Sequence, residues 1–195
     1  MQLTIRGSVL TFREVALRFV ESGLSDLFAY KNNKTLLETI DHPRYKKLAI
    51  HVRENYSSEL NSPLGEVLNK LKLSGDQYFK KFLNRYGDMN YCIFQITQPE
   101  ILSMKGLYLY LLNDDLKYVG RARDSYKNRI NQGYGKIHPK NCYLDGQATN
   151  CRLNALIGES QKSIRFFVCP LSNDAEILEY ERELIDAYHP PWNLL

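Results

Sequence analysis

Three phenols lie close together in the apolar stretch "GLYLYLLNDDLKYVGRARD", residues 106–124. Tyrosine is an unusual choice for the interior of a sheet, because its buried hydroxyl needs a hydrogen-bond partner. A three-residue loop at 113–115 would pair Tyr110 with Tyr118 and put Tyr108 on the same face, whereas a two-residue loop would turn Tyr118 to the other face. Phenols on one face could orient water or, beside a cation, accept a proton. They could equally be hydroxyls that reach solvent from a half-buried sheet.

A carboxylate interrupts an apolar stripe near the end of the chain. Residues 174–189, "DAEILEYERELIDAYH", predict a helix that Pro190 ends. One helical face carries Ile177, Glu181, Leu184 and Tyr188, with Leu178 and Ile185 alongside. The acids predicted on the opposite, solvated face are Glu179, Glu183 and Asp186. Because an unpaired buried carboxylate costs several kcal/mol, Glu181 should face either an Arg or Lys in a structural salt bridge or a bound metal ion.

The spacing of these residues resembles a known family. "GLY" at 106–108 followed by "YVG" at 118–120 looks like the signature of the GIY-YIG nucleases, whose two tyrosines are likewise ten residues apart. Arg129 is similar to the arginine of the family's next helix, with one residue inserted before it. The ending "LEYERELIDAYHPPWNLL" resembles the family's helix with a single metal-binding glutamate, and it places that residue at Glu181 and a late asparagine at Asn193. The resemblance covers about 106–193, and the first half of the chain resembles no family.

The resemblance implies a small antiparallel three-stranded sheet flanked by helices, and hydrolysis of a DNA phosphodiester with one divalent metal. Glu181 would hold Mg²⁺ or Mn²⁺, and no small-molecule cofactor is expected. Arg129 would steady the phosphate as charge develops. Tyr108 would take the proton from the attacking water, and Tyr118 would orient the water or the phosphate. Arg121 would help by lowering the pKa of Tyr108.

Charge is unevenly spread along a chain of net charge +4. Residues 117–152 hold eight Lys or Arg and two Asp, whereas residues 153–195 hold three Lys or Arg and seven Asp or Glu. Such a basic cluster either binds a polyanion or is a solvated face. The candidate nucleic-acid contacts are Arg123, Lys127, Lys136, His138, Lys140, Arg152 and Asn193. His138 with Cys142 and Cys151 would be an alternative zinc site, but their spacing fits no usual pair of zinc ligands.

The elements that position these residues predict an α+β protein of two domains. Residues 1–90 are expected to be mainly helical, and the boundary should fall between 88 and 105. The predicted helices of this first domain are 11–23, 42–56, 62–73 and 75–87. Residues 91–195 should form the nuclease domain, with strands at 90–97, 106–112, 116–122 and 163–171 and helices at 124–131, 151–160 and 174–189. The polar stretch 132–150 reads as a long functional loop.

Composition narrows the class of protein. With 195 residues, 44% hydrophobic and 25% charged, the chain is typical of a globular protein. No apolar run approaches the ~20 residues of a membrane span, and the N-terminus lacks the pattern of a signal peptide. Four scattered cysteines fit a reducing compartment, so a cytoplasmic location is expected.

The sequence therefore predicts a divalent-metal-dependent endonuclease acting on DNA, preferably double-stranded, in a restriction-like or other defence setting. Double-strand cleavage would usually need two active sites, hence a possible homodimer. Two alternatives stay open: a non-catalytic nucleic-acid-binding or scaffold protein that keeps the fold, and a repair-type nicking nuclease. A phosphate-centred site does not separate DNA from RNA. The recognition sequence, the cut pattern and the role of residues 1–90 are left undefined.

Overall fold

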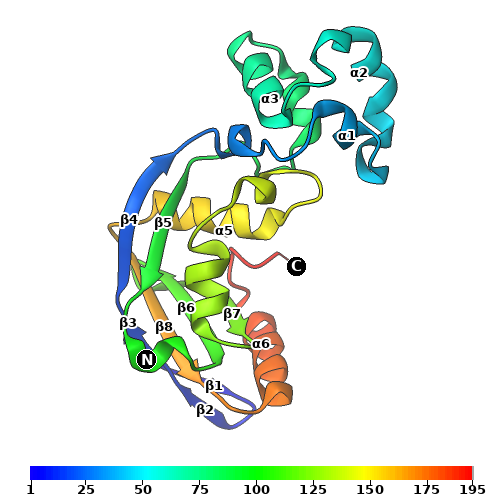
Figure 1. Cartoon of the computed structure of the whole chain (residues 1–195). Helices are drawn as coiled ribbons and strands as arrows, with labels where there is room; N and C mark the ends of the chain where they lie inside the picture. The colour runs from blue at the N-terminus through cyan, green and yellow to red at the C-terminus, as the bar shows by residue number, and fades with distance from the viewer. Residues whose placement is uncertain (195) are drawn as a thin grey trace. The chain divides into compact units, whose positions relative to one another are not determined.

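The computed structural model describes residues 1–194 and is a mixed α+β protein with antiparallel sheets. The chain forms two compact units (Figure 1). Unit 1 comprises 1–21, 92–136 and the chain from 156 onward, and unit 2 comprises 22–91 and 137–155. The predicted division near residue 90 therefore matches neither unit, because the first strands belong to unit 1 and the loop after residue 136 returns to unit 2.

The main sheet of unit 1 has four antiparallel strands in the order β3-β8-β6-β7. β6 (Gly106–Leu112) and β7 (Asp115–Ala122) form the predicted hairpin, and β8 (Ile164–Pro170) pairs with the other side of β6. Three neighbouring antiparallel strands were expected, and β3 (Arg13–Val15) adds a fourth at the edge of β8. β7 is the opposite edge strand.

The hairpin combines the two alternatives that the sequence left open, because its turn has two residues and yet the phenols share one face. Asn113 and Asp114 form a two-residue turn, and both have left-handed backbone angles, with φ of 51° and 66°. A register shift follows, so that Leu111 pairs with Leu116 but Tyr110 pairs with Tyr118. The extra residue of this β-bulge restores the pairing that a three-residue loop would have given.

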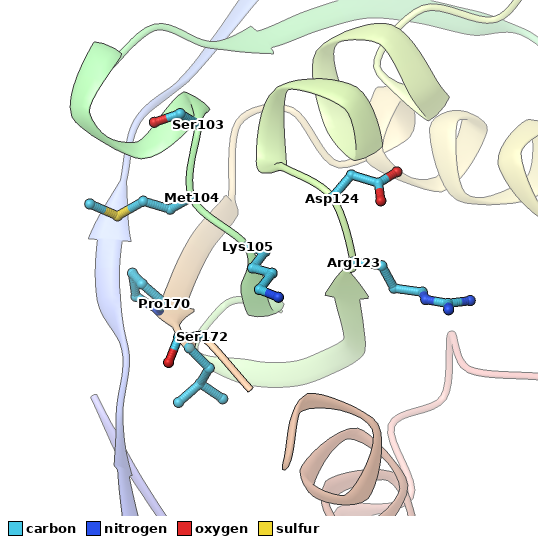
Figure 2. A pocket seen from close by; sticks show the side chains of 8 residues that line it. Ser103, Met104, Lys105, Arg123, Asp124, Pro170 and Ser172 are labelled. Atoms are coloured by element: carbon cyan, nitrogen blue, oxygen red, sulfur yellow. The ribbon is translucent and has the colours of Figure 1, made fainter. Parts of the chain in front are cut away.

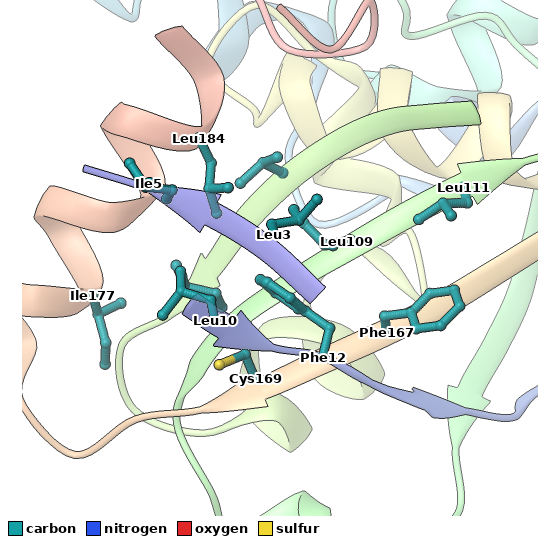
Figure 3. Packing of buried hydrophobic residues seen from close by; sticks show 12 residues of the cluster. Leu3, Ile5, Leu10, Phe12, Leu109, Leu111, Phe167, Cys169, Ile177 and Leu184 are labelled. Carbon is teal, nitrogen blue, oxygen red and sulfur yellow. The ribbon is translucent and has the colours of Figure 1, made fainter. Parts of the chain in front are cut away.

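The other face of the hairpin packs into the apolar core of unit 1 (Figure 3). That core joins β6 and β7 to β1 (Gln2–Ile5), β2 (Ser8–Thr11) and α6 (Asp174–Tyr188). Ile177 and Leu184, on the predicted apolar stripe of α6, are buried in this core. The stripe is shorter than predicted, because Leu178 and Tyr188 are exposed. Glu183 is not solvated as predicted: its side chain is only 11% exposed and lies 2.8 Å from Arg6.

The helix predicted at 11–23 is wrong, because these residues form β3 and β4 (Leu17–Leu24). Val15 of β3 is buried where it pairs with Phe166 of β8. Within β4 partly buried Leu17 and Phe19 alternate with exposed residues, the period of a strand. Thr11 and Glu14 have the spacing of a capping box, which favoured a helix, but pairing with strands distant in sequence outweighs that local preference. β4 forms a second sheet with β5 (Tyr91–Ile96), a strand that the sequence predicts.

Unit 2 is built from short helices, as predicted for most of this region. Its elements are η1 (Leu27–Tyr30), α1 (Leu36–Ile40), η2 (Pro43–Leu48), α2 (Ala49–Asn55), η3 (Ser57–Glu59), α3 (Leu64–Leu73), η4 (Gln77–Phe82), η6 (Pro139–Cys142) and the first part of α5 (Ala148–Glu159). In unit 1, α4 (Pro99–Leu102) precedes β6, and the π-helical segment η5 (Lys127–Tyr134) begins three residues later than the predicted helix. Among residues 1–194 no helix is long and apolar enough to cross a membrane.

Candidate active site

The phenols of the hairpin form one cluster on the sheet face opposite the apolar core. Tyr108 and Tyr110 have no exposed surface, and Tyr118 is partly buried. The rings of Tyr108 and Tyr118 stack with centroids 6.0 Å apart. Tyr134, from η5, adds a fourth ring, and its hydroxyl lies 2.9 Å from that of Tyr110. The sequence left Tyr134 open as either a further phenol of the site or an anchor of the polar loop, and the hydrogen bond to Tyr110 places it in the cluster.

Two glycines make room for this cluster. A Cβ at Gly120 would lie 2.5 Å from Cζ and 2.6 Å from Oη of Tyr108, so only glycine lets that ring cross β7. Gly106 has a φ of 145°, and a Cβ there would lie 2.2 Å from the carbonyl oxygen of Cys169. The close approach of neighbouring atoms therefore explains why glycine stands at both positions, without reference to any family.

Arg129 points from η5 into the phenol cluster. Its Nε donates a hydrogen bond of 3.2 Å to the hydroxyl of Tyr108, and its guanidinium carbon lies 5.3 Å from the centroid of the Tyr134 ring. Burial raises the pKa of Tyr108 well above its ordinary value, the neighbouring phenols raise it further, and Arg129 opposes them. The cation beside Tyr108 is thus Arg129 and not the predicted Arg121.

Arg121 instead forms an ion pair with Glu181 of α6. Their side chains are 30% and 16% exposed, so the pair is only partly open to solvent. Burial raises the pKa of Glu181 above its ordinary value, although Arg121 and, more weakly, Arg129 lower it. This is the salt bridge that the sequence left open beside the metal-ligand hypothesis. Both cations act on one carboxylate at the edge of the sheet.

Asn193 has a structural place at the same edge strand. Its Oδ1 accepts a hydrogen bond of 2.9 Å from the backbone N–H of Val119, and its Nδ2 donates one of 2.8 Å to the carbonyl of Val119. The backbone N–H of Trp192 donates to the carbonyl of Lys117 at 2.8 Å. The C-terminal segment therefore satisfies the outer backbone groups of β7, and both amide atoms of Asn193 serve this clamp rather than facing a ligand.

A hollow of about 650 Å³ opens at the strand ends of unit 1 (Figure 2). Lys105, directly before β6, and Arg123, directly after β7, both line it, together with Asp124 and Ser172. Lys105 forms an ion pair of 2.7 Å with Asp174, at the start of α6. Arg123 was predicted as a nucleic-acid contact, whereas Lys105 was not, because its neighbours in sequence carry no charge pattern.

The remaining predicted nucleic-acid contacts are shared between the two units. Lys127 and Lys136 are exposed in unit 1, whereas His138, Lys140 and Arg152 belong to unit 2. The basic run of the sequence is therefore divided between the two units. His138 is exposed, and its backbone N–H donates to Asn141.

The donor set of the site fits one kind of metal better than others. Among residues 1–194 no three His, Cys, Asp or Glu side chains gather in a group that could hold a metal ion. Zn²⁺ sites usually take three or four such ligands, but Mg²⁺ keeps several waters and accepts one or two carboxylates. Glu181 alone fits a hydrated Mg²⁺ when its carboxylate is released by Arg121.

Comparison of the chain with protein-family models, curated proteins and solved structures found no match in any of the three.

Proposed function

We propose that unit 1 is a divalent-metal-dependent phosphodiesterase of the GIY-YIG type that acts on DNA. One observation supports this most: residues separated by up to 73 positions in sequence, from Tyr108 to Glu181, share one electrostatic environment. Arg129 acts on the phenol of Tyr108 and on the carboxylate of Glu181 at once. Arginines can stabilise the negative charge that develops on a phosphate, and a carboxylate can hold the divalent metal that assists its hydrolysis.

The two arginines would bind the phosphate. Arg129 is held by Tyr108 and by the ring of Tyr134, so its orientation is fixed before any substrate arrives. Arg121 forms an ion pair with Glu181, and a bound phosphate would be a second anion with which it could pair. Moving Arg121 to the phosphate would release the carboxylate of Glu181, which would then hold Mg²⁺ or Mn²⁺. That ion, when bound, supplies a positive charge that stabilises the developing negative charge on the phosphate and the leaving oxygen.

The structure favours roles for Tyr108 and Tyr118 that differ from the expected ones. Tyr108 has no exposed surface and a raised pKa, so its hydroxyl is a poor acceptor for a proton from solvent water. Its oxygen instead accepts the hydrogen bond that positions Arg129. Tyr118 is the phenol of the pair that retains solvent exposure. We assign to Tyr118 the contact with the attacking water, and to Tyr108 the positioning of the arginine.

Glu181→Gln tests the proposal, because glutamine keeps the shape of the side chain and can still accept a hydrogen bond from Arg121. Wild-type protein should cleave plasmid DNA in the presence of Mg²⁺ but not with EDTA. Glu181→Gln should lose cleavage by at least about a hundredfold while its circular dichroism and thermal midpoint stay near wild type. Glu179→Gln is the matched control, because Glu179 is a 63%-exposed glutamate of the same helix. Cleavage retained by Glu181→Gln would refute the proposed function.

The second candidate is a nucleic-acid-binding protein without catalysis. The ion pair on Glu181 and the complete burial of Tyr108 favour it, since both occupy groups that a nuclease would use. It predicts that wild-type protein shifts DNA in a gel but leaves it intact with Mg²⁺ and with Mn²⁺. Restriction-like cutting by a dimer and repair-type nicking are distinguished by the products of the same reaction, discrete double-strand fragments in the first case and open circles in the second.

A further inference from the structure

The positive charge of this protein belongs to unit 2. Unit 2 contains 13 Lys or Arg and 9 Asp or Glu, whereas unit 1 contains 13 of each. The whole net charge of +4 therefore comes from the helical unit, whose role the sequence left undefined. Protein fields of one sign raise the local concentration of the opposite charge, so this distribution suggests a polyanion partner for unit 2.

Most acids of unit 2 are already committed to partners. Asp41 pairs with Arg53, and Asp26 and Asp88 both pair with Lys72. The other committed acids are Glu59 with Lys70, Asp76 with the hydroxyl of Tyr56, Asp145 with the hydroxyl of Tyr45, and Glu38 in the capping box of α1. None of these acids forms an ion pair with a Lys or Arg at 44–47 or 80–85 among the described residues.

Six of the exposed cations of unit 2 lie on two short helices or just after them and form no ion pair with any described residue, and we call these six the basic face. They are Arg44, Lys46 and Lys47 on η2, Lys80 and Lys81 on η4, and Arg85 just after it. The two short helices are neighbours, because Tyr45 of η2 stacks on Phe82 of η4 with ring centroids 6.0 Å apart. The buried rings hold the helices together and leave the lysines and arginines on the surface.

A hollow of about 350 Å³ lies within the basic face. Lys80, Leu83, Asn84 and Arg85 line it, together with Asp88, whose carboxylate shares the ammonium of Lys72 with Asp26. The Lys80 ammonium lies 5.7 Å from the ring centroid of Phe79, and the Arg85 guanidinium lies 5.4 Å from that of Tyr86. An aromatic face orients a cation without using its N–H groups as a carboxylate would, so both side chains keep their donors for another anion.

We propose that the basic face of unit 2 binds the phosphate backbone of duplex DNA, with one phosphate seated between Lys80 and Arg85. Planar guanidinium and ammonium donors across a hollow match the oxygens of a phosphate group. Such contacts carry no sequence information, so unit 2 holds the polymer and any base recognition lies elsewhere. The choice of DNA over another polyanion rests on the function proposed for unit 1.

Equilibrium binding of a fluorescent duplex of mixed sequence tests this inference. The full-length protein is titrated in EDTA, where no cleavage occurs, between about 50 and 200 mM KCl. The test protein is the double variant Lys80→Gln/Arg85→Gln. The matched control is Arg18→Gln/Lys162→Gln, which removes the same two kinds of charge from exposed positions of unit 1 that form no ion pair with any described residue. Thermal midpoints of both variants verify that they fold.

Each phosphate contact contributes about 0.9 to the slope of log K against log salt, so the test variant, which loses one phosphate contact, should have a slope shallower by about 0.9. Extrapolated from 1 M salt, where counterion release no longer contributes, that difference weakens binding by up to about 8-fold at 0.1 M. The control should keep the wild-type slope. Equal losses in both variants, or no binding by wild-type protein at low salt, would overturn the inference.

Two further measurements separate the partner from the chemistry. If vesicles containing phosphatidylserine lose their binding in the test variant while DNA binding persists, the face is a lipid-binding surface and the inference is wrong. If DNA binding depends on the basic face but Mg²⁺-dependent cleavage never occurs, the inference stands and the proposed catalytic function fails. Cleavage that is intact in the test variant at 0.2 M salt would contradict a role for unit 2 in holding the substrate.

Discussion

Replacing Gly120 by alanine should disturb the phenol cluster more than any other single methyl group. The added Cβ would lie 2.5 Å from Cζ of Tyr108 and 2.6 Å from Cε1 of Tyr118, well inside van der Waals contact. Tyr108 is fully buried, so its ring has no room to move away without displacing Arg129. Overpacking of this kind costs about 1–3 kcal/mol. In a chain of this length the thermal midpoint should fall by about 2–12 °C.

Thermal unfolding followed by near-ultraviolet circular dichroism measures this cost and reports on the tyrosines directly. Gly158→Ala is the control, because its Cβ would meet the Cys92 sulfur at 3.3 Å and alanine favours a helix. Gly120→Ala should also be less costly in a Tyr108→Leu background, where the ring of Tyr108 is gone and only the contact with Tyr118 remains. An equal cost in both backgrounds would show that the ring of Tyr108 does not lie against Gly120, and the geometry argued for the site would be wrong.

Three further outcomes are expected. In single-turnover and binding assays, Tyr118→Phe should reduce cleavage more than it reduces DNA affinity. Tyr108→Phe should weaken both, because Arg129 loses its hydrogen-bond acceptor. If the two variants changed cleavage and affinity in the same way, the roles assigned to the two phenols would be wrong. Asn193→Ala should lower the stability by about 1–3 kcal/mol in urea unfolding, since two backbone groups of β7 lose their partner, and an unchanged midpoint would contradict the clamp. Burial raises the pKa of Asp145, but the hydrogen bonds from Tyr45 and from a backbone N–H, together with the charge of Lys31, outweigh it and hold that pKa below its ordinary value. The pair therefore stabilises the fold above about pH 4 and is lost as the pH falls through the lowered pKa, so Tyr45→Phe should flatten the fall of the urea midpoint between pH 6 and pH 3.

The local patterns of the sequence predicted much of the structure around the site. Runs rich in apolar, β-branched and aromatic residues identified β6, β7 and β8, and a helical stripe identified α6 and Glu181 on it. These predictions succeed because residue preferences and the helical period act within one segment and do not depend on distant partners. Glu181 interrupts that stripe beside buried apolar residues, so its need for a cation followed from the sequence as well.

The identity of that cation was decided only by the fold. Arg121 and Glu181 are 60 residues apart, and nothing local to either selects the other. Likewise Arg129, and not Arg121, reaches Tyr108, because η5 directs the side chain of Arg129 toward the sheet. The sequence could name the candidates, but the pairing of charges depends on which elements pack together.

The strands near the N-terminus also show that local sequence alone does not predict the structure. Thr11 and Glu14 have the spacing of a helix start, yet Arg13–Val15 forms an edge strand against β8, some 150 residues later. A two-residue turn alone would have turned Tyr118 away from the other phenols, and only the bulge after Tyr110 keeps it on their face. The sequence by itself determined which residues could do chemistry and on which elements they lie. Tertiary structure decided which of them meet, because hydrogen bonds and packing between distant segments outweigh the small local preferences of the chain.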